Sequence, residues 1–303
     1  MNYALLLLPD FSLILIGFLV CRHTALNRTV WAQVDALVYF LLFPVLLFHS
    51  IVKMPLDLRA ASSLIAAGWT LGLTGIALSY CVPHLPWLRK HIDQRDHAAS
   101  AQIAFRFNSF IGLALAERIA GAQGIQLIAV LIGVCVPLFN VAAVWPMARH
   151  GGKSFLQELT RNPLIIATAS GLLANMAGFS IPAVLETTVS RLGAASLALG
   201  LMAAGAGMQF GALARAKTLA ISVLSIRHFF LPLVALGVSH LYGLSAVQTI
   251  VLLAFSALPT ASSCYVLAAR MGYDGAYVAG LVTLSTLLGM LSLPFALGVL
   301  RGL

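Results

Sequence analysis

Apolar runs of about 20 residues recur from end to end of the chain, separated by short stretches that carry charged residues, proline or glycine. A helix of about 20 apolar residues crosses a hydrocarbon core of about 30 Å. Only 9% of the 303 residues are charged and 60% are hydrophobic, whereas soluble domains carry roughly 25% charged residues. The runs therefore predict an all-α integral membrane protein, with no room for a soluble domain between them.

Ten runs have this character, and we expect each to form one membrane span. The expected spans cover residues 3–21, 34–52, 61–83, 97–121, 124–147, 163–179, 184–208, 217–241, 246–271 and 274–300. The first run has no lysine or arginine before it and no small-residue cleavage site. It therefore has the character of a retained span and not of a signal peptide.

Lysine and arginine are divided unevenly between the loops. The loops after odd-numbered spans hold eleven of these cations, whereas those after even-numbered spans, together with the C-terminal tail, hold five. By the positive-inside bias, the odd-numbered loops face the cytoplasm and both termini lie on the outer side of the cytoplasmic (inner) membrane. This topology explains the net charge of +9, so we expect a lipid bilayer and no nucleic acid as partner.

The two halves of the chain show a weak internal repeat. IGFL at residues 16–19 resembles SGLL at residues 170–173. Five spans in each half force the second copy to insert upside down, which is the inverted-repeat arrangement of many secondary carriers. We expect a first five-helix repeat over residues 1–148, a cytoplasmic linker over 149–162 and an inverted second repeat over 163–303.

Polar residues or proline interrupt two of the expected spans near their centres. The residues concerned are Arg106, Asn108 and Ser109 after Phe107 in the fourth span, and Pro259, Thr260, Ser262 and Ser263 in the ninth. Each part of an interrupted span is about 11 or 12 residues long and covers about half of the bilayer, so the breaks fall near the midplane. Proline removes a backbone donor, and Asn, Ser and Thr are good N-cap residues. Both spans are therefore expected to be discontinuous helices.

Two such breaks at matching positions indicate a substrate site. Broken backbone at membrane depth is tolerated only where it is buried in protein or lines a wet cavity. Helix N-termini carry free amide donors and partial positive charge, which favour an anionic group such as a carboxylate. We expect Asn108, Ser109, Thr260, Ser262 and Ser263 to hold a small organic anion through their side chains and exposed amides.

Other polar side chains within the spans have less certain roles. Arg106 either contacts the substrate or interacts with the negative C-terminal end of the first half-helix. Asn140, which follows Pro137, either lines the cavity or forms a hydrogen bond between helices. Arg227 is expected to snorkel toward the cytoplasmic surface, and Asp35 is expected to lie close to a membrane interface.

Enzyme motifs are absent from the sequence: it has no HExxH, no GxSxG, no P-loop and no paired intramembrane aspartates. Its four cysteines show no metal or redox spacing and have the character of packing residues. We therefore expect no catalytic residues, no metal and no cofactor, and uphill transport would draw on an ion or substrate gradient. Small residues on the third and seventh spans permit a homodimer without requiring one.

Six stretches resemble the auxin efflux carrier family in its bacterial permease form, which includes malonate and malate carriers. They are LPDFSLILIGFLV (8–20), WAQVDALVYFLLFPVLLFHSI (31–51), FRFNSFIGLALA (105–116), NPLIIATASGLL (162–173), LPTASSCYVLAARMG (258–272) and TLSTLLGMLSLP (283–294). The resemblance implies a ten-helix fold similar to that of bile acid sodium symporters. In that fold spans 1, 2, 6 and 7 form a scaffold, spans 3–5 and 8–10 form a mobile transport unit, and spans 4 and 9 cross at their breaks.

The crossing residues differ from those of plant members, in which a proline precedes an asparagine at both breaks. Phe107 replaces the first proline and Thr260 replaces the second asparagine, whereas Asn108 matches directly. These departures argue against auxin itself as the substrate. The leading hypothesis is a secondary carrier that moves a small carboxylate by alternating access. The alternatives are a sodium-coupled organic-anion symporter and a membrane sensor that binds a similar ligand without transporting it.

Overall fold

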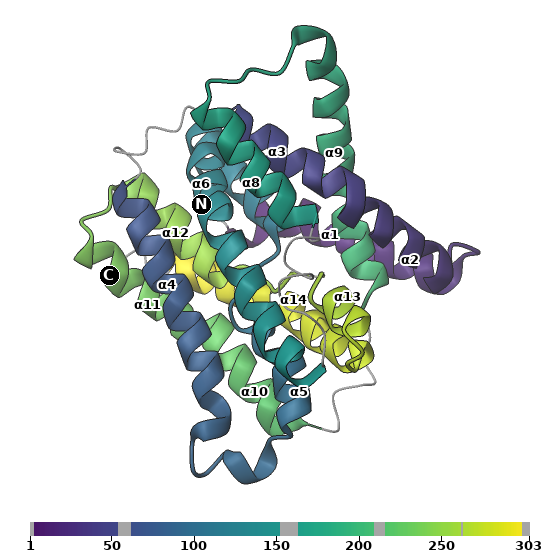
Figure 1. Cartoon of the computed structure of the whole chain (residues 1–303), viewed down its shortest axis with the longest axis vertical. Coiled ribbons are helices and arrows are strands. Elements are labelled where there is room, and N and C mark those ends of the chain that lie inside the picture. The colour runs from purple at the N-terminus through teal and green to yellow at the C-terminus, as the bar shows by residue number, and fades with distance from the viewer. Residues whose placement is uncertain (1–2, 54–61, 152–162, 209–215, 262, 299–303) are drawn as a thin grey trace.

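The computed structural model describes residues 3–53, 62–151, 163–208, 216–261 and 263–298, and every regular element within them is a helix (Figure 1). In lipid, a helix satisfies its own backbone donors and acceptors, which is why apolar membrane segments adopt this form. The expected all-α membrane architecture is confirmed at this level.

The helices of the first half follow the apolar runs. They are α1 (Tyr3–His23), α2 (Arg28–Leu37), η1 (Val38–Leu42), α3 (Phe43–Val52), α4 (Ser62–Cys81), η2 (Val82–His84), η3 (Arg89–His91), α5 (Gln94–Ser100), η4 (Ala101–Ile103) and α6 (Ser109–Gly151). Non-helical backbone angles at Ala120 and Gly121 divide α6 into two parts. This division falls between the fourth and fifth expected spans.

The second half continues in the same way. Its elements are α8 (Pro163–Met176), α9 (Ala183–Ala206), α10 (Lys217–Ser225), η6 (Ile226–Phe230), α11 (Leu231–Leu241), α12 (Ala246–Ala257), α13 (Ser263–Arg270) and α14 (Gly275–Gly298). The ten-span inverted repeat and its boundaries remain predictions, and residues 152–162 of the expected linker lie outside the described residues.

Several helical stretches are long and apolar enough to cross a membrane. Within the described residues these are Arg28–Val52, Ser62–His84, Gln123–Arg149, Lys217–Leu241 and Gly275–Gly298, with shorter apolar helices at Ser12–His23 and Ala246–Ala257. The chain is therefore a multi-pass membrane protein.

Two of these stretches contain a wider, π-helical turn, and each turn lies just before a proline. η1 precedes Pro44, and η6 precedes Pro232. A proline ring clashes with the carbonyl four residues earlier, which here belongs to Phe40 or His228 inside the π turn. The wider turn therefore lets each proline lie within a membrane-length helix.

The helices pack side by side along much of their length. α1 packs along α9, and α3 packs against both α8 and α9; elsewhere α4 packs against α6, and α12 packs against α6, α11 and α14. In Figure 1, α3, α8 and α9 lie in the upper part, α5 and α10 lie in the lower part, and α12, α14 and α13 run across the middle. Gly68 and Gly72 of α4 face Leu131 and Phe139 of α6, so this small-residue face is used within the chain.

Glycines bring α1 and α9 into backbone contact. A Cβ atom added to Gly17 would lie 1.9 Å from the carbonyl oxygen of Met202, and one added to Gly205 would lie 1.8 Å from that of Ile14. A Cβ atom added to Gly171, which matches Gly17 in the predicted repeat, would lie 3.3 Å from the side chain of Ile51 in α3 and 3.5 Å from the Cα of Phe48. Gly171 thus lies at the α8–α3 contact without the close backbone approach of Gly17, and the internal repeat remains a prediction.

The α1–α9 contact generates a stability prediction. Gly205→Ala forces the two backbones apart, and overpacking of this kind costs about 1–3 kcal/mol. The variant should therefore have a lower melting temperature in detergent than the wild-type protein. Gly237→Ala is the matched control, because no atom lies within 4 Å of its added Cβ. Equal melting temperatures for the two variants would contradict the backbone contact.

Candidate functional site

The two interrupted spans meet at their breaks. The first break separates η4 from α6, and the second separates α12 from α13. The amide of Asn108 in the first break donates a hydrogen bond to the carbonyl of Pro259 in the second, with N and O 2.7 Å apart. The expected interruptions are therefore present, and they lie in direct contact.

Local sequence explains both breaks. Leu258 has an extended backbone (φ −57°, ψ 143°) because the ring of a following proline disfavours the helical region. At the other break Asn108 caps α6: its side-chain oxygen accepts from the amide of Ile111 at 3.2 Å, and its carbonyl accepts from Gly112 at 3.0 Å. The N-cap predicted at Asn108 is confirmed.

Thr260 ties the two breaks to α14. Its hydroxyl donates to the carbonyl of Ile103 at 2.8 Å, and its amide donates to the hydroxyl of Ser285 at 2.9 Å. Thr260 is fully buried, and it does not line the cavity described next. Its hydroxyl and amide thus form hydrogen bonds within the protein and hold the crossing against α14.

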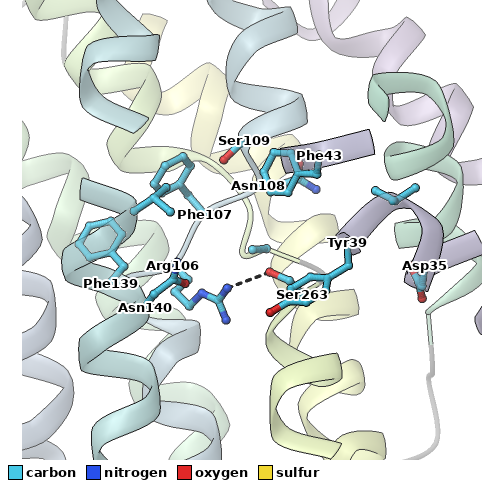
Figure 2. A pocket seen from close by; sticks show the side chains of 13 residues that line it. Asp35, Tyr39, Phe43, Arg106, Phe107, Asn108, Ser109, Phe139, Asn140 and Ser263 are labelled. Carbon is cyan, nitrogen blue, oxygen red and sulfur yellow. Dashed lines mark hydrogen bonds between the residues drawn. The ribbon is translucent and has the colours of Figure 1, made fainter. Parts of the chain in front are cut away.

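A cavity of about 60 Å³ lies beside the crossing (Figure 2). A water molecule needs about 10–15 Å³ of such space, so the cavity can hold several waters or a ligand of a few heavy atoms. Its wall comes from α2, η1 and α3, from the two breaks, from the second part of α6, and from α13. The lining residues are Asp35, Val38, Tyr39, Phe43, Arg106, Phe107, Asn108, Ser109, Val136, Phe139, Asn140, Ala261 and Ser263.

The cavity thus brings together Arg106, Asn108, Ser109, Asn140 and Ser263 of the predicted site. Phe107, at the predicted break, also lines it and packs on Phe255 of α12 with ring centroids 4.4 Å apart. One predicted residue, Thr260, is not at the wall and is buried beside it. Ser262 lies outside the described residues.

The surroundings of Arg106 bear on both of its predicted roles. It lines the cavity, and its guanidinium donates to Gln102 at 2.8 Å and to Ser263 at 3.0 Å. Gln102 in turn donates to the carbonyl of Ala99 at 2.9 Å, in the last turn of α5. Arg106 therefore reaches the end of the first half-helix through Gln102, and the bonds to Gln102 and Ser263 occupy two of its five guanidinium N–H donors.

Asn140 has an unpaired donor. Its side chain is 1% exposed, and its amide nitrogen has no hydrogen-bond partner within the described structure. Leaving a buried donor unpaired costs about 1–3 kcal/mol. Of the two predicted roles, the structure favours the cavity wall over a bond between helices, and the free N–H group is available to a ligand or water there.

Arg227 does not snorkel to the surface as predicted. It is 1% exposed, and its guanidinium donates to the carbonyls of Leu258 at 2.6 Å and Phe255 at 3.2 Å. The last carbonyls of a helix lack intrahelical partners and carry partial negative charge, which a cation stabilises. Arg227 therefore caps α12 at the break, and its position inside an apolar span was the signal for a specific partner.

Two further residues were not among the predicted site residues. The hydroxyl of Ser285 in α14 accepts from the Thr260 amide and lies 2.8 Å from Nε2 of His228. Asp35 lines the cavity, and its predicted place close to a membrane interface stays a prediction. The sequence around Asp35 does not predict its place on the cavity wall, because the packing of distant elements determines which face of a helix meets a cavity. Within the described residues, no three His, Cys, Asp or Glu side chains gather as a metal site would require.

The Arg227 cap generates the second stability prediction. Arg227→Gln replaces a cation with a shorter neutral side chain and leaves carbonyls at the end of α12 unpaired, which costs about 1–3 kcal/mol. Arg22→Gln removes the same charge from an exposed position on α1 and should change stability by less than about 0.5 kcal/mol. Thermal unfolding of both variants in the same detergent compares them, and an Arg227→Gln protein as stable as the control would contradict the cap.

Comparison with known proteins agrees with this architecture. Residues 145–297, half of the chain, match the family model described as "Membrane transport protein". A protein of Rhizobium meliloti (strain 1021) named "Putative malonate transporter" is 24% identical, over 98% of this chain and 95% of its own length. An "Uncharacterized transporter" of Methanothermobacter thermautotrophicus is 23% identical, over 93% of each chain. The chain therefore belongs to the membrane transport protein family, that of the auxin efflux carriers, and is a transporter.

Proposed function

We propose that this transporter is a secondary carrier that moves a small carboxylate across the cytoplasmic membrane by alternating access. The observation that carries the proposal is the pair of broken helices that meet beside a cavity lined by Arg106, Asn108 and Asn140. Discontinuous helices of this kind form substrate sites in many secondary carriers.

The donors on the cavity wall favour an anion. The guanidinium of Arg106 is cationic, and planar carboxylates match its paired N–H groups. α6 begins at Ser109, so the partial positive charge of a helix N-terminus also lies at this wall. Asn140 adds a buried donor that has no partner in the described structure. Together these groups would neutralise a carboxylate that has left water.

The size of the cavity favours a small substrate. About 60 Å³ is space for a few heavy atoms and not for an indole ring with its side chain. The Rhizobium meliloti relative carries malonate in its name, so malonate is the first substrate to test. Apolar walls at Val136 and Phe139 would contact the carbon atoms of such a molecule.

The position of the cavity supports alternating access. Asp35, Tyr39 and Phe43 contribute one wall from α2, η1 and α3, whereas the crossing contributes the other (Figure 2). α3 packs with α8 and α9, which belong to the expected scaffold, and α12 packs with helices of the expected transport unit. A substrate held at the crossing would therefore pass along the scaffold as one group moves against the other.

A charge placed in the cavity tests the carrier proposal. Asn108→Asp keeps a good N-cap residue but introduces a negative charge that repels an anion. Purified wild-type protein should be stabilised by malonate in a thermal shift assay and should exchange labelled malonate in proteoliposomes, whereas the variant should fold and do neither. No response of the wild-type protein to any small carboxylate would overturn the anion site. Binding without exchange would support the sensor alternative instead.

Asn140 supplies a finer test of the same site. Asn140→Leu removes the unpaired donor at similar volume, and loss of a hydrogen bond to a charged group should weaken malonate binding about tenfold or more. Ser196→Ala is the control, because Ser196 is also buried with an unpaired polar atom but does not line the cavity. Titration calorimetry measures both affinities. Equal affinities would remove Asn140 from the site.

A further inference from the structure

Asp35 places a carboxylate on the wall of a cavity whose other polar groups suit an anion. We propose that Asp35 takes up a proton when the substrate anion binds, so that the carrier moves the carboxylate and the proton together. This inference rests on the proposed function and adds the coupling ion to it. The chemical step is one proton transfer: an O–H bond forms at a side-chain oxygen of Asp35, and the O–H bond of a hydronium ion from the aqueous phase breaks and releases water.

The geometry places Asp35 and the anion-binding donors around one space. Asp35, Tyr39 and Phe43 lie on one side of the view in Figure 2, and Arg106, Phe107 and Asn140 lie on the other. An anion bound to Arg106 and Asn140 therefore shares a small, largely apolar cavity with the Asp35 carboxylate. Charges interact more strongly in such surroundings than in water, so the anion and an ionised Asp35 repel each other.

Among the described residues, no cation forms an ion pair with Asp35. Its contact from α13 is the Tyr265 hydroxyl, which donates a hydrogen bond to it, and within the described residues no salt bridge involves it. On its own helix, Arg28 lies over the Tyr265 ring, 5.5 Å from the centroid, and donates to the carbonyl of Ala206. The ionised form of Asp35 is therefore stabilised by the neutral hydroxyl of Tyr265 and by Arg28, whose guanidinium is bonded to another residue.

The remaining charged and titratable groups nearby have other partners. Arg270 of α13 lies over the rings of Tyr39 and Phe40, 5.1 and 4.5 Å from their centroids. Arg106, across the cavity, is bonded to Gln102 and Ser263. Cys21 lies on α1, and the carboxylate of Glu186 on α9 pairs with His49 and Lys53. Glu186 does not line the cavity, so Asp35 is the carboxylate at its described wall.

Anion and proton must therefore bind cooperatively. A bound anion favours the neutral form of Asp35, because neutralisation removes the repulsion between them. Linkage is reciprocal, so a proton on Asp35 strengthens anion binding by the same factor. Tyr265 can serve both states, since its hydroxyl donates to the carboxylate and can accept from the protonated carboxyl group.

The same proton affects the contact between the two helix groups. Asp35 is on α2, in the expected scaffold, and Tyr265 is on α13, in the expected transport unit. A hydrogen bond to an ionised carboxylate is roughly twice as strong as one between neutral groups. Loading the site with anion and proton therefore weakens a bond that must break when the transport unit moves along the scaffold.

Titration calorimetry with malonate tests the coupling directly. Experiments in two buffers of different ionisation enthalpy, repeated between about pH 7 and about pH 8.5, give the protons taken up for each malonate bound. The wild-type protein should take up as much as one proton, and its affinity should fall as the pH rises, by at most about tenfold per pH unit. Asp35→Asn should still bind malonate. The variant protein should take up no proton on binding, and its malonate affinity should not change with pH.

Two further variants complete the test. Glu117→Gln removes an exposed carboxylate on α6 that does not line the cavity, so it should match the wild-type protein. Tyr265→Phe removes the donor that stabilises the ionised form, so its pH profile should shift to higher pH even if Asp35→Asn does not fold. Wild-type binding without proton uptake, or unchanged uptake in Asp35→Asn, would overturn the coupling and leave the carrier proposal standing. A complete lack of malonate binding would instead contradict the carrier proposal itself.

Discussion

Backbone groups that leave a helix at membrane depth must find partners within the protein, and this requirement organises the crossing. The amide of Asn108 donates a hydrogen bond to the carbonyl of Pro259 across the two breaks. The hydroxyl of Thr260 donates to the carbonyl of Ile103, and the guanidinium of Arg227 donates to the carbonyls at the end of α12. Because unsatisfied groups are costly in hydrocarbon, these bonds hold the breaks together and keep the surrounding helices in place. The cavity exists beside the crossing because the chain there is neither helical nor exposed to lipid.

The two breaks are alike in the sequence but differ in which side chains they place at the cavity. At the second break, Thr260 is bonded to Ile103 and Ser285, and Arg227 covers the end of the preceding half-helix. At the first break, Arg106, Asn108 and Ser109 face the cavity. Among the described residues, the second break contributes Ala261 and Ser263 to the cavity wall, whereas Thr260 is bonded within the protein. The two breaks therefore place different sets of side chains at the cavity.

Local signals in the sequence were sufficient for the helices and the breaks. Apolar runs predict helices, a proline at 259 predicts an extended Leu258, and an asparagine at 108 predicts a cap, because each effect acts within a few residues. The places of Asp35, Thr260 and Arg227 could not be predicted in this way. Each depends on the partner that a distant element presents: α13 for Asp35, α14 for Thr260, and the end of α12 for Arg227. Hydropathy identifies Arg227 only as a charge in an apolar span. It does not identify the carbonyls that accept hydrogen bonds from its guanidinium.

The π turn in η1 has a consequence for how the cavity is assembled. Such a turn holds about one residue more than an α turn, so the helical segments on either side of it differ in phase by about 100° from a regular helix. Asp35 precedes η1, whereas Phe43 follows it, and both reach the same cavity. The turn therefore sets the angular register between the acidic and the aromatic parts of this wall. Helix phase, as well as side-chain identity, determines which chemistry this span presents to the cavity.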